Sequence, residues 1–409
     1  MDIVRQEVDR LYKKDFGRLV TAVLYSTRDF GLEGAEDIVH DTYAAALKDW
    51  GTHGIPENPT GWLYKVCRHK ALNKIRKEKK IENLNGEAGL DSMEIKFTES
   101  ILEDHQLKLL FACAHPDLAP KAQVVITLKY VINLKVEAIA KILGMTIDGI
   151  DKLLLRARQK IRDEKILFEE PITQQLGKRL AMVHKVLYLI FNEGYKSSWG
   201  KQMIREELCE DALIMTKTLI DTSLANKETY ALYALMLFNA ARFKSRFGAL
   251  GELLDLEHQD RSLWNKGLIL LAKDFLLQSR DEEITTYHVE ASIAYVHCSA
   301  ANFQSTDWNT IRKLYEQLLS DNSNPFIELN YAIAMYHAGQ TNRAFEILNR
   351  LHRQPVMNQY SLLNTTLGKF YQREGAGLLA RKYLEQALKQ TSFIAEKNFI
   401  AKMIDKLSD

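Results

Sequence analysis

The sequence predicts an all-helical protein. Apolar residues recur at three- and four-residue spacing along almost all of its 409 residues, and only seven residues are prolines. No stretch shows the sustained alternation of apolar and polar residues, closed by turn signals, that marks strands. Hydrophobic residues make up 46% of the chain, so a large core is available, and the length suggests two to four domains.

Composition excludes several classes of protein. The four cysteines are scattered, which excludes a cysteine-rich zinc module and argues against a disulfide framework. No run of about 18 apolar residues predicts a membrane span, and the N-terminus lacks the pattern of a signal peptide. We therefore expect a reduced, cytoplasmic protein without a bound metal or cofactor.

Residues 2–50 are predicted to form a short helix followed by two longer ones. In the segment 34–47, helical spacing turns Ile38, Thr42, Ala45 and Ala46 inward. The opposite face is polar and carries Glu36, Asp37, His40 and Asp41. This face fits a solvated helix surface, with acids favoured near the helix N-terminus, or a binding surface.

The segment 61–77 predicts a strongly basic helix. Its apolar stripe consists of Leu63, Val66, Cys67, Ala71 and Ile75. From residue 62 to residue 80, eight lysines and arginines stand against one glutamate, a net charge of +7, whereas the whole chain carries +2. Such a face suits a phosphate backbone, although a solvated helix face is the common alternative.

Two further segments differ in charge. Residues 81–104 hold seven acids and one lysine, with little periodicity, and predict a mobile acidic linker or a simple tether. Residues 105–168 form a second helical unit that ends in a helix-turn-helix pattern: a helix at 134–142, a turn at 143–145 and a helix at 147–162. Gly144 suits the turn and Thr146 the N-cap, and an ordinary corner of two helices is the alternative.

Residues 169–409 predict repeated helix hairpins. Small and large packing residues recur with a period of 36 residues, close to the ~34 residues of tetratricopeptide repeats. The first set is Ala332, Met335, Ala344 and Leu348, and the second includes Leu367, Gly368, Tyr371, Ala380, Leu384 and Ala387. Stacked hairpins form a concave binding surface, and a plain helical bundle is the alternative.

Together these segments resemble the extracytoplasmic-function (ECF) sigma factors of bacterial RNA polymerase. The resemblance rests on the motifs at 35–42, 58–63 and 115–120 and on the helix-turn-helix. Motifs at 187–195 and 260–264 are similar to those of the ECF subgroup with a C-terminal tetratricopeptide-like (TPR-like) extension. One departure is His40, where the family usually has glutamine.

The resemblance implies four parts: sigma region 2 (1–80), the acidic linker (81–104), sigma region 4 (105–168) and a TPR-like regulatory extension (169–409). It implies that region 2 binds core polymerase through Glu36, Asp37, His40, Asp41 and Tyr43. Residues expected at the −10 element are Asn58, Trp62, Tyr64, Lys65, Arg68, Lys70, Lys74, Arg76 and Lys77. Those expected at the −35 element are Thr146, Asp148, Lys152, Arg156, Arg158 and Lys160.

The partners implied are the clamp and flap of core RNA polymerase, promoter DNA and, on the extension, either an unknown protein or the sigma domains themselves. Trp62 and Tyr64 could stack on unpaired bases, and Trp62 could equally anchor its helix in the core.

Two other functions fit the pattern less fully. One is a helix-turn-helix regulator that uses the repeats as a sensor, and the other is an interaction scaffold with incidental basic patches. An enzyme is the least favoured class. The sequence has no glycine-rich phosphate loop, no metal-spaced cluster of histidine and cysteine, and no nucleophile elbow.

Overall fold

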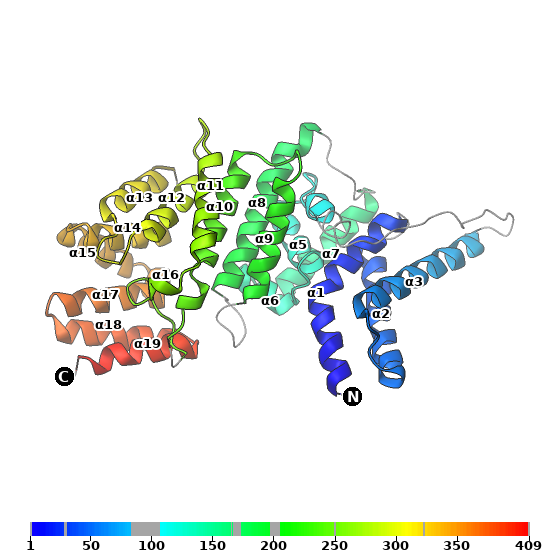
Figure 1. The fold of residues 1–409 in the computed structure, drawn as a ribbon, viewed down its shortest axis with the longest axis horizontal. Helices are drawn as coiled ribbons and strands as arrows, with labels where there is room; N and C mark the ends of the chain where they lie inside the picture. The colour runs from blue at the N-terminus through cyan, green and yellow to red at the C-terminus, as the bar shows by residue number, and fades with distance from the viewer. Residues whose placement is uncertain are drawn as a thin grey trace. The chain divides into compact units, whose positions relative to one another are not determined.

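The computed structural model describes residues 2–27, 31–82, 107–164, 166, 173–196, 205–248, 251–321 and 324–407. Within these ranges the regular structure is helical, apart from one isolated bridge between Phe247 and Leu253 (Figure 1). The all-helical prediction is confirmed. The chain divides into two compact units: residues 1–193 with 210–224, and residues 194–209 with 225–409. The predicted acidic linker lies outside the described residues, except for residues 81 and 82.

The first unit begins with three long helices that pack against one another: α1 (Asp2–Thr27), α2 (Leu32–His53) and α3 (Pro59–Glu82). Their shared core includes the fully buried side chains of Phe16, Trp50 and Leu63. The predicted break between a short and a longer helix in residues 2–27 was wrong. Gly17 lies inside α1, where the helix continues through it.

The second helical group of this unit starts with a helical stretch at 107–113 and contains α5 (Pro120–Tyr130), α6 (Val136–Ile142) and α7 (Ile147–Asp163). The helix-turn-helix is formed by α6 and α7. Gly144 has φ +62°, and the backbone N–H of Met145 donates to the carbonyl oxygen of Ala140 at 2.8 Å, which ends α6 as the sequence predicted. The Thr146 hydroxyl accepts from the Gly149 N–H at 3.1 Å and caps α7.

The first unit extends beyond the predicted boundary at residue 168. It includes α8 (Thr173–Tyr195) as far as Glu193, and α9 (Glu206–Ile220) from residue 210. Arg179 of α8 is buried and donates to the carbonyl oxygen of Phe111 at 3.4 Å. A cut at residue 168 would therefore remove part of the packing of this unit.

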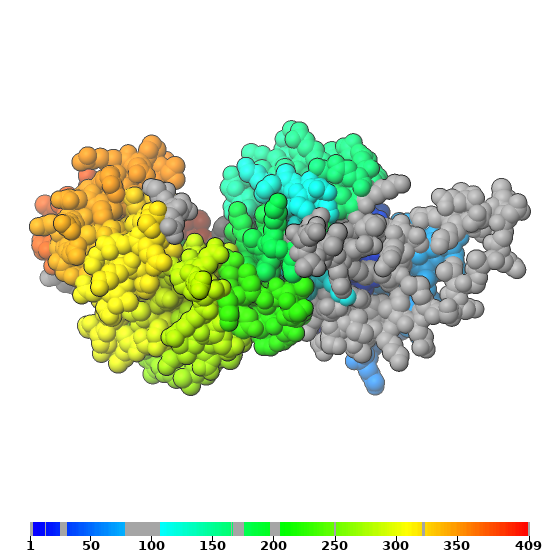
Figure 2. Space-filling model, turned by 90° about the horizontal axis from the view of Figure 1, so that it is seen from above, coloured from blue at the N-terminus to red at the C-terminus, as the bar shows by residue number. Residues whose placement is uncertain are grey.

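The second unit is a succession of helix hairpins. Consecutive helices pack in pairs, including α10 with α11, α12 with α13, α14 with α15, and α17 with α18. Figure 2 shows the side chains of α12–α15, in yellow to orange, gathered over one face of this unit. The helices are α10 (Lys227–Ala240), α11 (Lys266–Gln278), α12 (Thr286–Ser299), α13 (Trp308–Asp321), α14 (Pro325–His337), α15 (Thr341–His352), α16 (Pro355–Asn358), α17 (Ser361–Arg373), α18 (Gly377–Gln390) and α19 (Ile394–Asp405).

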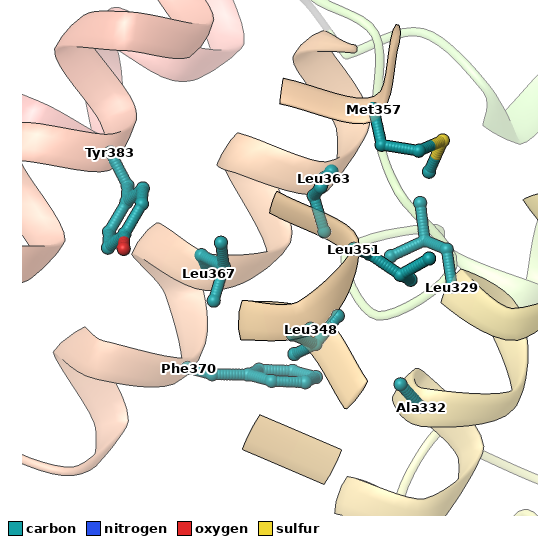
Figure 3. Packing of buried hydrophobic residues seen from close by; sticks show 9 residues of the cluster. All are labelled: Leu329, Ala332, Leu348, Leu351, Met357, Leu363, Leu367, Phe370 and Tyr383. Atoms are coloured by element: carbon teal, nitrogen blue, oxygen red, sulfur yellow. The ribbon is translucent and has the colours of Figure 1, made fainter. Parts of the chain in front are cut away.

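The predicted 36-residue period has a backbone counterpart. Gly339 ends α14 with φ +83°, and Gly375 ends α17 with φ +76°. After each glycine the next N–H donates back to the helix, from Gln340 to Met335 at 2.9 Å and from Ala376 to Tyr371 at 2.8 Å. The two hairpins share a core that includes Leu348, Leu367 and Phe370 (Figure 3). The period is therefore that of a structural repeat.

Two further features concern the cysteines and the apolar content of the helices. All four cysteines are buried and free, and burial raises the pKa of Cys67 and Cys113 to about 12, so these thiols stay protonated. Among the described helices, none has the length and apolar content needed to cross a membrane.

The close approach of α17 and α18 at Gly368 can be tested. A Cβ atom there would lie 2.6 Å from Cγ of Leu384 and 3.2 Å from the carbonyl oxygen of Ala380. We expect Gly368→Val to lower the free energy of unfolding by about 1–3 kcal/mol, because overpacking forces the two helices apart. Denaturant unfolding of the full chain, followed by circular dichroism, measures this change.

Gly377→Ala is the matched control. A Cβ atom at Gly377 meets nothing within 4 Å, so this change should leave stability the same or raise it slightly. Equal losses in both variants would contradict the packing account.

Candidate nucleic-acid interface

Helix α3 separates an apolar face from a basic one. Leu63, Cys67, Ala71 and Ile75 are buried against α1 and α2, as the sequence predicted. Among the side chains that the structure describes, the rest of the helix surface carries six cations: Lys65, Arg76 and Lys77 are exposed, and Arg68, Lys70 and Lys74 are half-buried. The predicted basic surface is therefore present on one side of one helix.

Most of this charge is not neutralised within the part of the chain that the structure describes. In those ranges, no carboxylate oxygen lies within 4.0 Å of the charged groups of Lys65, Lys70, Arg76 or Lys77. Uncompensated cations along a helix raise the local positive potential and attract phosphate. This face of α3 is suited to a nucleic-acid backbone.

The neighbouring polar and aromatic side chains serve partly structural roles. Tyr64 is buried in the core, so its ring is not presented at the surface. The same burial raises the pKa of its hydroxyl. Trp62 is half-buried, with its ring 5.3 Å from that of the buried Trp50 in an edge-on arrangement. Asn58 is exposed and accepts from the Gly61 N–H at 2.8 Å, which caps the start of α3.

Helix α7 presents its first turns to solvent. Thr146, Asp148, Lys152 and Arg156 are exposed, as a helix entering a DNA groove requires. Lys152 donates to the Asp148 carboxylate at 2.6 Å, so part of the local charge is neutralised. Lys160 lies 3.5 Å from Glu164, while Arg156 has no carboxylate within 4.0 Å among the described residues.

Helix α2 carries the predicted polymerase-binding face. Asp37, His40 and Asp41 are exposed. Tyr43 is buried instead, and its hydroxyl donates to the carbonyl oxygen of Leu11 at 2.9 Å. The side chain of Glu36 is only 13% exposed, because other helices cover it.

The cover on Glu36 comes from α5 and α7. Lys129 Nζ lies 3.0 Å from one carboxylate oxygen of Glu36, and Arg158 Nη2 lies 3.2 Å from the other. The Tyr130 hydroxyl donates to Glu36 at 3.2 Å and accepts from Arg158 Nε at 2.6 Å. Burial by itself would raise the pKa of Glu36, but the two cations outweigh it and hold this pKa below its ordinary value. We call these four residues the Glu36 cluster.

Close packing adds to the contact that the Glu36 cluster makes between the helices α1–α3 and the helices α5–α7. A side chain at Gly17 of α1 would overlap the carbonyl oxygen of Val131, at the end of α5. Asn133 has φ +57°, and its Nδ2 donates to the carbonyl oxygen of Tyr12 at 3.1 Å. Glu33 adds a longer ion pair with Arg158 at 3.4 Å.

The structure thus brings together two residues that the sequence assigned to different partners. Glu36 was expected at the polymerase and Arg158 at DNA, yet each is the other's ion-pair partner here. Sequence reasoning missed Lys129, Tyr130 and Asn133. A contact between segments more than 90 residues apart leaves no periodic signal in the sequence.

Comparison with known proteins agrees with this geometry. The family profile of Sigma-70 region 2 matches residues 14–81, and that of Sigma-70, region 4 matches residues 108–161. A family of unknown function (DUF6596) matches residues 179–280. No solved structure matches the chain.

Relatives support the same division. The RNA polymerase sigma factor SigV of Bacillus subtilis is 30% identical over 151 residues, which cover 37% of this chain and 84% of SigV. The chain belongs to the family of RNA polymerase sigma factors. The sigma factor YlaC of Bacillus subtilis is 24% identical over 160 residues, covering 39% of this chain and 91% of YlaC. An uncharacterized protein of Rhizobium meliloti, R00370, is 28% identical over 385 residues, covering 92% of this chain and 90% of that protein.

A sigma factor is a non-catalytic subunit that joins RNA polymerase to promoter DNA and starts transcription. In this sigma factor, α1–α3 belong to region 2, and α5–α7 belong to region 4. The Glu36 cluster therefore joins region 2 to region 4. The long C-terminal part carries a domain whose function is unknown.

The contribution of the Glu36 cluster to this contact can be measured. We expect Arg158→Gln to weaken the contact between regions 2 and 4 by about 1–2 kcal/mol, because Glu36 loses a charged hydrogen bond and keeps Lys129. The separated form would become 5 to 30 times more populated. Hydrogen–deuterium exchange of residues 32–43 and 128–133 in the full chain reports this change as faster exchange.

Arg156→Gln is the control, since it removes the same charge two residues away, at an exposed position on another side of α7. It should leave exchange in both segments unchanged. If Arg158→Gln and Arg156→Gln gave the same exchange, the ion pair would not hold the contact.

Proposed function

We propose that this protein is an ECF sigma factor in which α3 holds the opened −10 element, α7 reads the −35 element and α2 docks on core polymerase. The observation that carries the proposal is the basic face of α3, where four cations have no carboxylate within 4.0 Å among the described residues, together with a capped helix-turn-helix in a chain that matches both sigma regions. The resemblance to ECF factors supplies the finer assignment.

At the −10 element, an unpaired strand needs cations for its phosphates and a ring for its bases. The cations are supplied by α3 through Lys65, Arg68, Lys70, Lys74, Arg76 and Lys77. Trp62 is the ring that remains partly accessible, and Asn58 adds a polar group at the start of the helix. We assign Tyr64 to the core of region 2 and not to base stacking, because it is buried.

At the −35 element, the duplex is read by the exposed first turns of α7. Thr146, Asp148 and Lys152 face solvent there, and the carboxylates of Asp148 and Asp151 lower the local positive charge. Phosphate contacts then fall to the flanking cations Arg156, Arg158 and Lys160.

For polymerase docking we propose the exposed polar face of α2, with Asp37, His40 and Asp41 at the surface of the clamp. Glu36 joins this face only when region 4 moves away from it, because its carboxylate is now bound by Lys129 and Arg158. Tyr43 supports the helix from inside through its hydrogen bond to Leu11.

The contact between regions 2 and 4 has a consequence for initiation. The two promoter elements are centred about 25 base pairs apart, roughly 85 Å of duplex at 3.4 Å per base pair. Arg158 Nη2 of α7 lies 3.2 Å from the Glu36 carboxylate of α2, and α3 packs directly on α2. One chain cannot keep this contact and read both elements, so we propose that the described arrangement is a resting form. The TPR-like extension would modulate the change through protein contacts.

The role of α3 predicts a salt effect. Replacing Lys65, Lys70 and Arg76 together by glutamine should weaken promoter opening. It should also make the slope of the logarithm of the opening constant against the logarithm of salt concentration shallower by about 2, because three phosphate contacts to a single strand are lost. Permanganate footprinting of the opened promoter between low and moderate salt measures both quantities.

Replacing the exposed cations Lys273, Arg353 and Lys389 by glutamine gives the same total charge change in the second unit, and should leave the slope unaltered. If the slope were unaltered in the α3 variant as well, the proposal that α3 holds the −10 element would be contradicted.

The resting-form proposal predicts the effect of freeing α2. Full-length Arg158→Gln should bind core RNA polymerase 5 to 30 times more tightly than the unaltered chain when no DNA is present, since less free energy is needed to expose Glu36. Asp37→Lys combined with Asp41→Lys should weaken binding. Co-elution and fluorescence anisotropy with purified core enzyme test both changes. Failure of the folded, unaltered chain to bind core enzyme at all would overturn the polymerase-docking assignment.

A further inference from the structure

The second unit contains a cavity of about 370 Å³. Helices α12, α13, α14, α17 and α19 contribute to its walls, and the segment 242–259 closes one side. This volume lies in the range of sites for small organic ligands. Neither the sigma regions nor the basic face of α3 takes part in it.

One wall is built of flat rings. Trp308 stacks on His337 with ring centroids 4.5 Å apart, and Phe303 lies 5.1 Å from Trp308. Burial, reinforced by nearby cations, lowers the pKa of His337 to about 4 and that of His297 to about 3, so both imidazoles are neutral at physiological pH. The wall therefore offers an uncharged aromatic surface.

A second wall holds two buried cations. Arg242 and Arg246 are 8% and 6% exposed, and both line the cavity. Each guanidinium donates to Tyr195, Arg242 to its hydroxyl and Arg246 to its carbonyl oxygen. Among the described residues, no carboxylate oxygen lies within 4.0 Å of either guanidinium, and Nε of Arg242 has no hydrogen-bond partner. Burial, and to a lesser extent the like charge of Arg242, lowers the pKa of Arg246 below its ordinary value.

The acids of the cavity do not neutralise these arginines, because each acid is already paired with another cation. Lys369 binds both Asp255 and Glu257, Arg373 also binds Glu257, and Lys196 binds Glu396 at 3.0 Å. Asp255, Glu257 and His258 lie close enough together to hold a metal ion, but the Lys369 ammonium already occupies both carboxylates. The lining holds four cations and three carboxylates, so it carries a net charge of +1.

We propose that this cavity binds a small aromatic carboxylate. The carboxylate would lie against Arg242 and Arg246, whose planar forks match its two oxygens. The ring system would lie against Trp308 and His337, which present a flat apolar surface. A monoanion is favoured over a phosphate dianion because one negative charge balances the net charge of +1 of the lining. The inference goes beyond the proposed function and stands or falls separately from it.

The test uses two probes of the same shape on the full-length chain. 2-Naphthoate carries the carboxylate, and 2-naphthalenemethanol replaces it with a neutral alcohol. We expect titration calorimetry to show that 2-naphthoate binds at least tenfold more tightly. This preference should fall by tenfold or more in Arg242→Gln, while the affinity for the alcohol stays the same. Arg353→Gln removes an exposed arginine outside the cavity and should change neither affinity.

A blocking variant shows where the probes bind. Asn330 of α14 lines the cavity and is only half-buried, so Asn330→Trp should fill the space and abolish binding of both probes. Three results would overturn the proposal: equal affinity of the unaltered chain for the two probes, binding of neither, or unchanged binding in Asn330→Trp. If Arg242→Gln fails to fold, the comparison of the two probes on the unaltered chain still decides. Loss of polymerase binding in any variant does not bear on this result.

Discussion

The arrangement of the first unit depends on one carboxylate. Glu36 accepts from Lys129, Tyr130 and Arg158 at 3.0–3.2 Å, and each donor belongs to the other sigma region. A carboxylate so nearly buried is stable only while its donors stay in place, because an unpaired charge there would cost several kcal/mol. Gly17 permits the approach by leaving room for the carbonyl oxygen of Val131. Charge complementarity and close packing therefore act at the same contact.

Cations serve three purposes in this protein, and their surroundings distinguish them. Along α3 they face solvent with few carboxylate partners, which suits an external polyanion. In α7, Arg158 is held by acids of α2, so its charge is already satisfied within the chain. In the second unit, Arg242 and Arg246 are buried beside Tyr195 and line a cavity. Exposure and carboxylate partners, more than the number of basic residues, separate these three roles.

Much of the local structure could be predicted from the sequence. The inward face of α2, the Gly144 turn, the Thr146 cap and the 36-residue repeat each depend on residues close together in the chain. The single long α1 was missed, because the sequence analysis divided residues 2–27 between two helices. Burial of Tyr64 and the pairing of Glu36 with Arg158, 122 residues apart, depend on tertiary packing that spacing alone does not encode. The cavity of the second unit was missed for the same reason, since its walls come from segments that lie far apart in the chain.

If Glu36 binds polymerase and Arg158 binds DNA, as we propose, the ion pair between them makes these two binding events cooperative. If polymerase takes Glu36, Arg158 is released for a phosphate, and if DNA takes Arg158, Glu36 becomes available to polymerase. Thermodynamic linkage requires each partner to strengthen the other by the same factor, whichever arrives first. The free energy of one intramolecular contact therefore sets how strongly either partner alone is disfavoured relative to both together. Under the proposed assignments, the chain would respond fully only when polymerase and DNA are both present, because both compete with the same ion pair.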